Sequence, residues 1–274
     1  MRTDLLKTQP LALYQPERID ALLAGPLVKP RTIARGLNTS TEIIPLIGFI
    51  SQHDSSFGTS LDQFNAQLLD ATNDSTIDRV LIVIDSPGGS VYVVQETAAM
   101  LRAARTRKPI IAIANSLAAS AAYWIGSQAS EFYCTPSGEV GSIGVFQIHQ
   151  DISTALRKAG LKPTIISAGK YKVEGNPYQS LGKGTQDFMQ SRIDDYFNQF
   201  IQDVSAGRGV DPSKVRKDFG QGRLIGAKDA ATLGMIDGVM TLQAVLKGRQ
   251  SLTSRRAAQI ASTTIAKARL KLLQ

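Results

Sequence analysis

RVLIVIDSPGGS, residues 79–90, joins a continuous apolar run to a turn that contains two adjacent glycines. A short apolar run rich in β-branched residues is typical of a strand that is buried on both faces of a parallel sheet. Gly88 and Gly89 can adopt positive φ and let a ligand come close to the backbone. The following residues, 91–105, have the pattern of a helix. The stretch therefore predicts a buried strand, a tight turn and a helix in succession.

The alternation of strands and helices continues on both sides of this stretch. We expect strands at 42–50, 109–114, 131–134, 143–149 and 163–166, and helices at 61–70, 117–129, 152–159 and 185–204, the last with Thr185 as its N-cap. Such alternation predicts an α/β domain with mostly parallel strands and right-handed crossovers.

Composition excludes several classes of protein. The chain has 274 residues, of which 43% are hydrophobic and 20% charged, as in ordinary globular proteins. One cysteine, Cys134, excludes an internal disulfide framework and a multi-cysteine metal site, and two histidines argue against a His-rich metal centre. We expect no metal and no cofactor. No apolar run approaches the roughly 20 residues that span a bilayer, and the N-terminus has no apolar signal region, so we expect a soluble, cytoplasmic protein.

Positive charge is concentrated at the C-terminus. Of the 31 Lys and Arg residues, seven lie in 247–274, which contains no Asp or Glu, and the other 24 nearly balance the 23 acidic residues. This segment predicts a surface helix with a solvated basic face, and a docking element for a partner protein is the second interpretation. Because no aromatic residues alternate with the charges, binding of nucleic acid is not favoured.

A second candidate segment, NSLAASAAYW at 115–124, follows the expected strand 109–114. Ser120 lies between two pairs of alanines, which leave room for a substrate backbone. A hydroxyl near the start of a helix has backbone donors close by. Composition alone favours an ordinary buried helix, and a serine hydroxyl is a poor nucleophile without a base.

Three side chains are candidate bases for Ser120. His149 ends an expected strand, and Lys170 and Lys172 lie in the loop SAGKYKVEGNPY at 167–178. A lysine amine is a base only when neutral, so its pKa must fall by about 3 units from ~10.4, which desolvation in an apolar pocket supplies. Because the loop follows an expected strand, we expect it at the same edge of the sheet as the other strand ends. The residues alone leave the choice open.

The segments become more specific in combination. Five motifs occur in order, namely DSPGGSV at 85–91, NSLAASAAYW at 115–124, GEVGSIGV at 138–145, the lysine loop, and LIGAKDAATLGMIDGV at 224–239. The series resembles the S49 serine peptidase family, the signal peptide peptidase A and protease IV group, and the lysine loop with GNPY is most similar to its phage branch, the lambda-type capsid assembly (prohead) proteases. The resemblance implies a Clp/crotonase-like stack of ββα units with mostly parallel strands. It implies a peptidase domain at 42–240, between an N-terminal arm at 1–41 and a basic helical tail at 241–274.

The resemblance assigns roles by position in these motifs. It makes Ser120 the nucleophile and Lys172 the general base, with Lys170 as the rival base two residues away. It also implies further site residues, namely backbone oxyanion donors at Gly88, Gly89 and Ala121, and a hydroxyl that orients the lysine at Ser142.

The implied function is a serine endopeptidase with a Ser–Lys dyad. The lack of a membrane-spanning segment favours a prohead protease that cleaves scaffold, portal or coat proteins in the host cytoplasm or within proheads. A soluble bacterial peptidase that degrades signal peptides or other peptides is the first alternative, and a catalytically silent assembly protein is the second. The expected partners are protein or peptide substrates, and self-association into a homo-oligomer is expected by resemblance.

Overall fold

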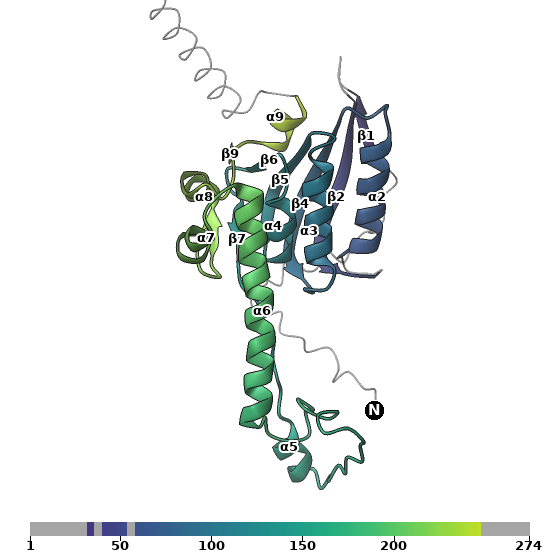
Figure 1. The fold of residues 1–274 in the computed structure, drawn as a ribbon, viewed down its shortest axis with the longest axis vertical. Helices are drawn as coiled ribbons and strands as arrows, with labels where there is room; N and C mark the ends of the chain where they lie inside the picture. The colour runs from purple at the N-terminus through teal and green to yellow at the C-terminus, as the bar shows by residue number, and fades with distance from the viewer. Residues whose placement is uncertain (1–31, 36–39, 54–57, 248–274) are drawn as a thin grey trace, which may run out of the picture. The chain divides into compact units, whose positions relative to one another are not determined.

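The structure is a computed structural model that describes residues 32–35, 40–53 and 58–247 (Figure 1). Most of the expected N-terminal arm (1–41) and basic tail (241–274) lies outside the described residues. The chain divides into two compact units. Residues 145–199 form the first, called here the inserted unit, and the described residues before 145 and after 199 form the second, called here the sheet unit.

The sheet unit contains a sheet of nine described strands. These are β1 (Thr32–Arg35), β2 (Ser40–Ser51), β3 (Gly58–Ser60), β4 (Arg79–Gly89), β5 (Ile110–Ala119), β6 (Glu131–Cys134), β7 (Glu139–Gly141), β8 (Leu224–Gly226) and β9 (Gly238–Val239). The main path runs β1-β2-β4-β5-β6-β9, in which only the β1–β2 pair is antiparallel. β3 pairs with β2, and β7 lies between β5 and β8. The predicted α/β class with mostly parallel strands is confirmed.

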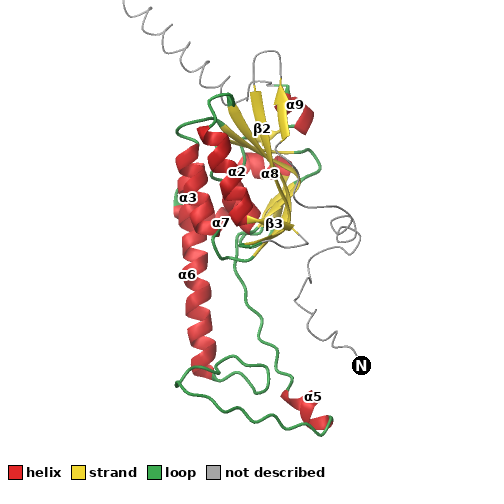
Figure 2. Cartoon of the chain, turned by 90° about the vertical axis from the view of Figure 1, so that its right-hand side faces the viewer, coloured by secondary structure: helices red, strands yellow, loops and turns green. Residues whose placement is uncertain are grey.

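Helices cover both faces of this sheet. In the sheet unit they are α2 (Leu61–Asn73), α3 (Val94–Ala104), α4 (Ala121–Gly126), the last residues of α6 (Lys183–Arg208), α7 (Pro212–Asp218), α8 (Ala227–Leu233) and α9 (Leu242–Leu246). Figure 2 shows α2 and α3 on one side of the strands and α9 on the other. On the α9 side, Val245 packs with Leu81, Ile113 and Tyr133 in a buried cluster. Burial on both faces explains the continuous apolar runs of β4 and β5. No described helix is both long and apolar enough to cross a bilayer.

The local predictions were wrong for four elements. The helix expected from residue 117 begins at Ala121, because residues 117–119 continue β5 and pair with β7. The strands expected at 143–149 and 163–166 are absent, and both stretches lie in or next to the inserted unit, where their apolar side chains find no neighbouring strand. The helix expected from Thr185 begins at Lys183.

The inserted unit contains α5 (Ser153–Lys158) and most of α6. The division between the two units falls within α6, since Phe200 and the residues after it belong to the sheet unit. The lysine loop at 167–178 therefore belongs to the inserted unit and does not extend from a strand.

Candidate active site

Ser120 is the single residue between the end of β5 and the start of α4. Its φ of 53° and ψ of −124° lie in a region that residues with side chains rarely adopt. Two backbone hydrogen bonds maintain this conformation. The Ser120 N–H donates to the Gly141 carbonyl at 2.8 Å, and the Trp124 N–H donates to the Ser120 carbonyl at 2.9 Å. A serine on a strained strand-to-helix turn is the arrangement that exposes a nucleophilic hydroxyl at the edge of an α/β sheet.

The glycine turn lies directly beside Ser120. Gly88 has a φ of 97°, and a Cβ placed there would be 2.7 Å from the Ser120 Cβ and 3.0 Å from the Ala121 nitrogen. The position therefore admits no side chain. A Cβ on Gly89 would instead collide with the Ile50 carbonyl of β2. The structure brings Gly88 and Ala121 to Ser120, whereas the absent side chain of Gly89 makes room for a neighbouring strand.

Ser86 connects the glycine turn to β2 through its hydroxyl. Its buried hydroxyl donates to the Gly48 carbonyl at 2.6 Å and accepts the Gly88 N–H at 3.1 Å. Ser142, the predicted lysine-orienting residue, follows Gly141 and has a φ of 52°. It is half-buried and its N–H donates to the Arg223 carbonyl at 2.9 Å. Ser142 is thus one residue away from the carbonyl that holds Ser120.

The candidate bases lie together in the inserted unit. Lys170 and Lys172 are both exposed, and the Lys170 ammonium lies 4.8 Å from the centre of the Tyr171 ring. The loop is a series of turns, in which the Asn176 side-chain amide donates to the Val173 carbonyl at 2.7 Å. The His149 Nε2 lies 3.0 Å from the Asn176 carbonyl oxygen. Because a carbonyl only accepts hydrogen bonds, this nitrogen carries the proton and His149 anchors the loop.

A buried network that the sequence reasoning missed holds α4 in place. The Trp124 ring stacks on Phe200 of α6 at a centroid distance of 4.4 Å. The Trp124 indole N–H donates to Asp203 Oδ2 at 2.9 Å, and Arg102 of α3 donates to Asp203 Oδ1 at 3.1 Å. An aspartate on an otherwise apolar helix face was the available signal. Asp203 joins α3, α4 and α6 behind Ser120.

Asp203→Ala is expected to lower the free energy of unfolding by about 3 kcal/mol. It leaves the buried Trp124 N–H without its acceptor and removes the carboxylate from the Arg102 guanidinium, which keeps, among the described residues, only its bond to Gln128 Oε1. Urea titration followed by circular dichroism measures this. The matched control is Asp187→Ala, which removes an exposed i,i+4 pair with Lys183 and should change stability by no more than about 0.5 kcal/mol. Equal effects of the two substitutions would contradict the role of Asp203.

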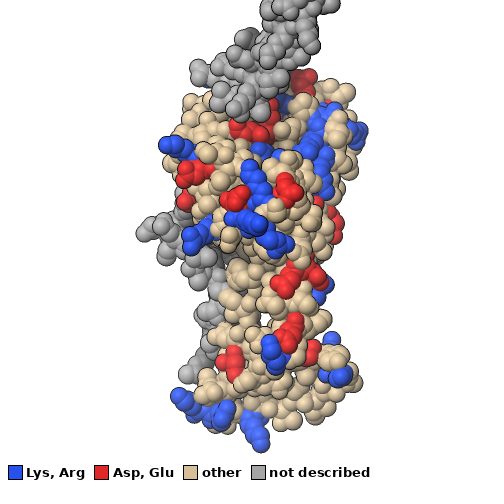
Figure 3. All heavy atoms as spheres, turned by 60° about the vertical axis from the view of Figure 1, so that its left-hand side comes forward, with Lys and Arg blue, Asp and Glu red and all other residues tan. Residues whose placement is uncertain are grey.

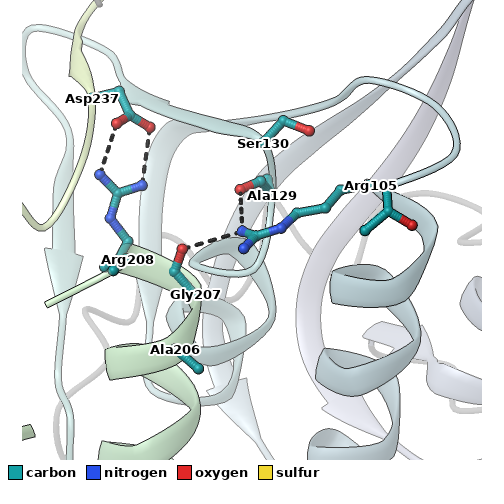
Figure 4. Close-up of a pocket in the computed structure, with 9 residues that line it drawn as sticks. Arg105, Ala129, Ser130, Ala206, Gly207, Arg208 and Asp237 are labelled. Carbon is teal, nitrogen blue, oxygen red and sulfur yellow. Dashed lines mark hydrogen bonds and ion pairs between the residues drawn. The ribbon is translucent and has the colours of Figure 1, made fainter.

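A pocket of about 430 Å³ lies at the opposite edge of the sheet, near the start of β6 (Figure 4). Its lining residues are Arg105, Thr106, Ala129, Ser130, Ala206, Gly207, Arg208, Gly209 and Asp237. Arg208 forms two hydrogen bonds with Asp237, both at 2.9 Å, and Arg105 donates to the Ala129 and Gly207 carbonyls. These hydrogen bonds connect α6 to the sheet. We therefore interpret the residues of this pocket as structural and not as a ligand-binding site.

Charged side chains do not point to a different kind of site. Lys and Arg are interspersed with Asp and Glu on the face that Figure 3 shows. The described residues contain no group of three or more His, Cys, Asp or Glu that could hold a metal ion. Burial raises the pKa of the Cys134 thiol to about 12. A reactive cysteine needs a lowered pKa, so Cys134 is not a candidate nucleophile.

Known proteins share sequence and fold with this chain. Residues 102–254 match the family model Peptidase family S49. Capsid assembly protease C of Escherichia phage lambda is 32% identical over 192 residues, which cover 70% of this chain and 43% of that protein. Protease 4 of Haemophilus influenzae is 27% identical over 190 residues, which cover 68% of this chain and 30% of that protein. The chain thus spans less than two thirds of the length of either relative.

A solved structure shares the fold. A ClpP1 mutant from Listeria monocytogenes superposes with a TM-score of 0.50 at 17% sequence identity, covering 75% of this chain and 94% of that chain. At this identity the likeness concerns the fold alone, and it confirms the predicted Clp/crotonase-like architecture.

Proposed function

The chain belongs to peptidase family S49, and on that premise we propose that it is a serine endopeptidase in which Ser120 is the nucleophile and Lys172 the general base. The observation that carries the proposal is the strained turn at Ser120, with Gly88 packed so closely against it that no side chain fits between them. Such strain persists where the surrounding structure enforces it, and it is concentrated at active sites.

The proposed reaction proceeds in two steps. Lys172 is exposed in the structure, so bound substrate must first cover its amine, because desolvation favours the neutral form. The neutral amine then takes the proton from the Ser120 hydroxyl as Oγ attacks the scissile carbonyl. Backbone N–H groups of the Gly88–Gly89 turn and of Ala121 stabilise the oxyanion. The Gly88 N–H contributes only after it leaves the Ser86 hydroxyl, to which it donates in this structure. The protonated lysine then gives its proton to the leaving amine, and an acyl-enzyme ester remains. Water hydrolyses the ester with the same lysine as base.

A Ser–Lys dyad needs no third carboxylate, because an amine has no tautomer to fix. In this mechanism the Ser142 hydroxyl orients the lysine amine. The family resemblance supports this role, and so does the hydrogen bond from the Ser120 N–H to Gly141, the residue before Ser142.

The experiment that tests the proposal is hydrolysis of casein, an unstructured protein, by the purified full chain, with the products identified by mass spectrometry. Peptides that accumulate with time and disappear in the Ser120→Ala variant support the proposal. Intact casein after prolonged incubation with freshly purified protein contradicts it and favours a silent assembly protein.

The finer proposal is a prohead protease that cleaves scaffold, portal or coat proteins. It rests on the similarity to Capsid assembly protease C of phage lambda. The similarity to Protease 4 supports the alternative, a peptidase that degrades signal peptides or other peptides. Portal and major capsid genes beside this gene, together with cleavage of those products on coexpression, would distinguish the first function from the second.

We further propose that the inserted unit binds a second copy of this chain. No residue of 145–199 is buried, and eight large hydrophobic side chains there are exposed, namely Phe146, Ile148, Leu161, Ile165, Ile166, Tyr171, Tyr178 and Phe188. A segment without a buried core gains stability only by covering such surface, and exposed apolar patches mark interfaces. Sedimentation of the full chain is expected to give a mass that is a multiple of 29.5 kDa. A monomer at micromolar concentration would contradict this.

A further inference from the structure

Three chain segments end side by side at the candidate site. β7 pairs in parallel with β5 and antiparallel with β8, through the terminal residues Ala119, Gly141 and Leu224. The adjoining residues Ser120, Ser142 and Arg223 therefore form a row across the three segments. Adjacent strands are about 4.8 Å apart, so the Arg223 backbone lies about 10 Å from that of Ser120.

Hydrogen bonds fix the positions in this row. The Ser120 N–H donates to the Gly141 carbonyl at 2.8 Å, and the Ser142 N–H donates to the Arg223 carbonyl at 2.9 Å. The Arg223 N–H in turn donates to the Gly220 carbonyl at 3.0 Å. The turn that precedes Arg223 contains three successive positive φ values, 83° at Gly220, 49° at Gln221 and 92° at Gly222. The Arg223 backbone is thus hydrogen-bonded through both its N–H and its carbonyl.

The Arg223 side chain differs from those of Arg102 and Arg208 because it has no acidic partner among the described residues. Arg102 and Arg208 are paired with Asp203 and Asp237, respectively. Arg223 is exposed, and its guanidinium makes no hydrogen bond or ion pair with any residue that the structure describes. A guanidinium binds a carboxylate through two parallel hydrogen bonds, which makes arginine the preferred residue for recognising acidic groups.

We propose that Arg223 is a specificity-determining residue that binds an aspartate or glutamate side chain of the substrate close to the scissile bond. The proposal rests on the proposed function, because it uses Ser120 as the point of cleavage. An extended peptide rises about 3.3 Å per residue, so a distance of about 10 Å corresponds to about three residues. The acidic side chain therefore lies within about three residues of the cleaved bond.

The first experiment maps cleavage sites in a mixture of peptides from a proteome digest, using the full chain and mass spectrometry. Sites are expected to be enriched in Asp or Glu at one position within three residues of the cut. Two fluorogenic peptides then differ only at that position, with Glu in one and Gln in the other. The wild type is expected to cleave the Glu peptide roughly tenfold faster in kcat/KM, the size typical of a hydrogen bond to a charged group.

Variants assign the preference to one side chain. Arg223→Gln is expected to cleave the two peptides with equal kcat/KM, and Arg223→Lys to keep part of the preference because it keeps the charge. The matched control is Lys228→Gln, which removes another exposed cation of the sheet unit and should keep the full preference. High salt should weaken the preference, since it screens exposed charges.

The outcomes separate this inference from the proposed function. Equal cleavage of both peptides by the wild type, or a preference that survives in Arg223→Gln, would overturn the role of Arg223. In either case, cleavage of the Gln peptide that disappears in Ser120→Ala would leave the peptidase function intact. Failure to cleave any peptide of the digest would overturn both.

Discussion

Ser120→Ala is expected to reduce the kcat of peptide hydrolysis to background, a loss on the order of 10⁶-fold by analogy with other serine peptidases. The substitution removes only Oγ. The residue keeps its Cβ, so the strained backbone and its bonds to Gly141 and Trp124 are retained. The melting temperature should therefore stay within a few degrees of the wild type, and the loss is chemical.

The control for this experiment is Ser116→Ala. Ser116 lies in β5, four residues before Ser120, and is also half-buried. The Ser116→Ala variant should cleave casein at close to the wild-type rate. Peptide products that form at more than about a thousandth of the wild-type rate in Ser120→Ala would show that another residue supplies the nucleophile.

Lys172→Ala is expected to abolish turnover as completely as Ser120→Ala, because the two residues of the proposed dyad would act as a unit. Lys172→Arg should be equally inactive, since a guanidinium does not lose its proton in proteins. The arginine variant keeps the positive charge and most of the length, so its inactivity would separate a base from a structural cation.

The rival bases provide the matched controls. Lys170→Ala removes an ammonium that contacts the Tyr171 ring and should keep activity within a few-fold of the wild type. His149→Gln retains a side-chain donor for the Asn176 carbonyl and should also remain active. Full activity of Lys172→Ala, with loss in either of the other two, would move the base to that residue.

The sequence predicted those strands whose own residues are apolar enough to indicate burial. β2, β4 and β6 were found because each is a short apolar run, and such a run suits a strand covered on both faces. β7 was missed because three residues, Glu-Val-Gly, carry no pattern, and the strand exists only through its pairing with β5 and β8. The apolar residues at 143–149 and 163–166 imitate strands because periodicity does not reveal whether a neighbouring strand is present.

The candidate site was predictable in part for the same reason. Ser120 and the glycine turn are carried by local motifs, whereas the distinction between Gly88 and Gly89 requires the neighbouring backbone, because one faces Ser120 and the other faces Ile50. Asp203 and Arg223 come from segments distant in the sequence. Only the packing of α6 on α4 and the pairing of β8 with β7 bring them to the site.

Ser120, Ser142 and Gln221 all carry side chains at positive φ, a geometry that glycine adopts without strain. Substitution by glycine would release that strain, and at Ser120 it would also delete the proposed nucleophile. Laboratory evolution for heat resistance alone would thus select glycine at these three positions. Only concurrent screening for turnover would keep the serine at position 120.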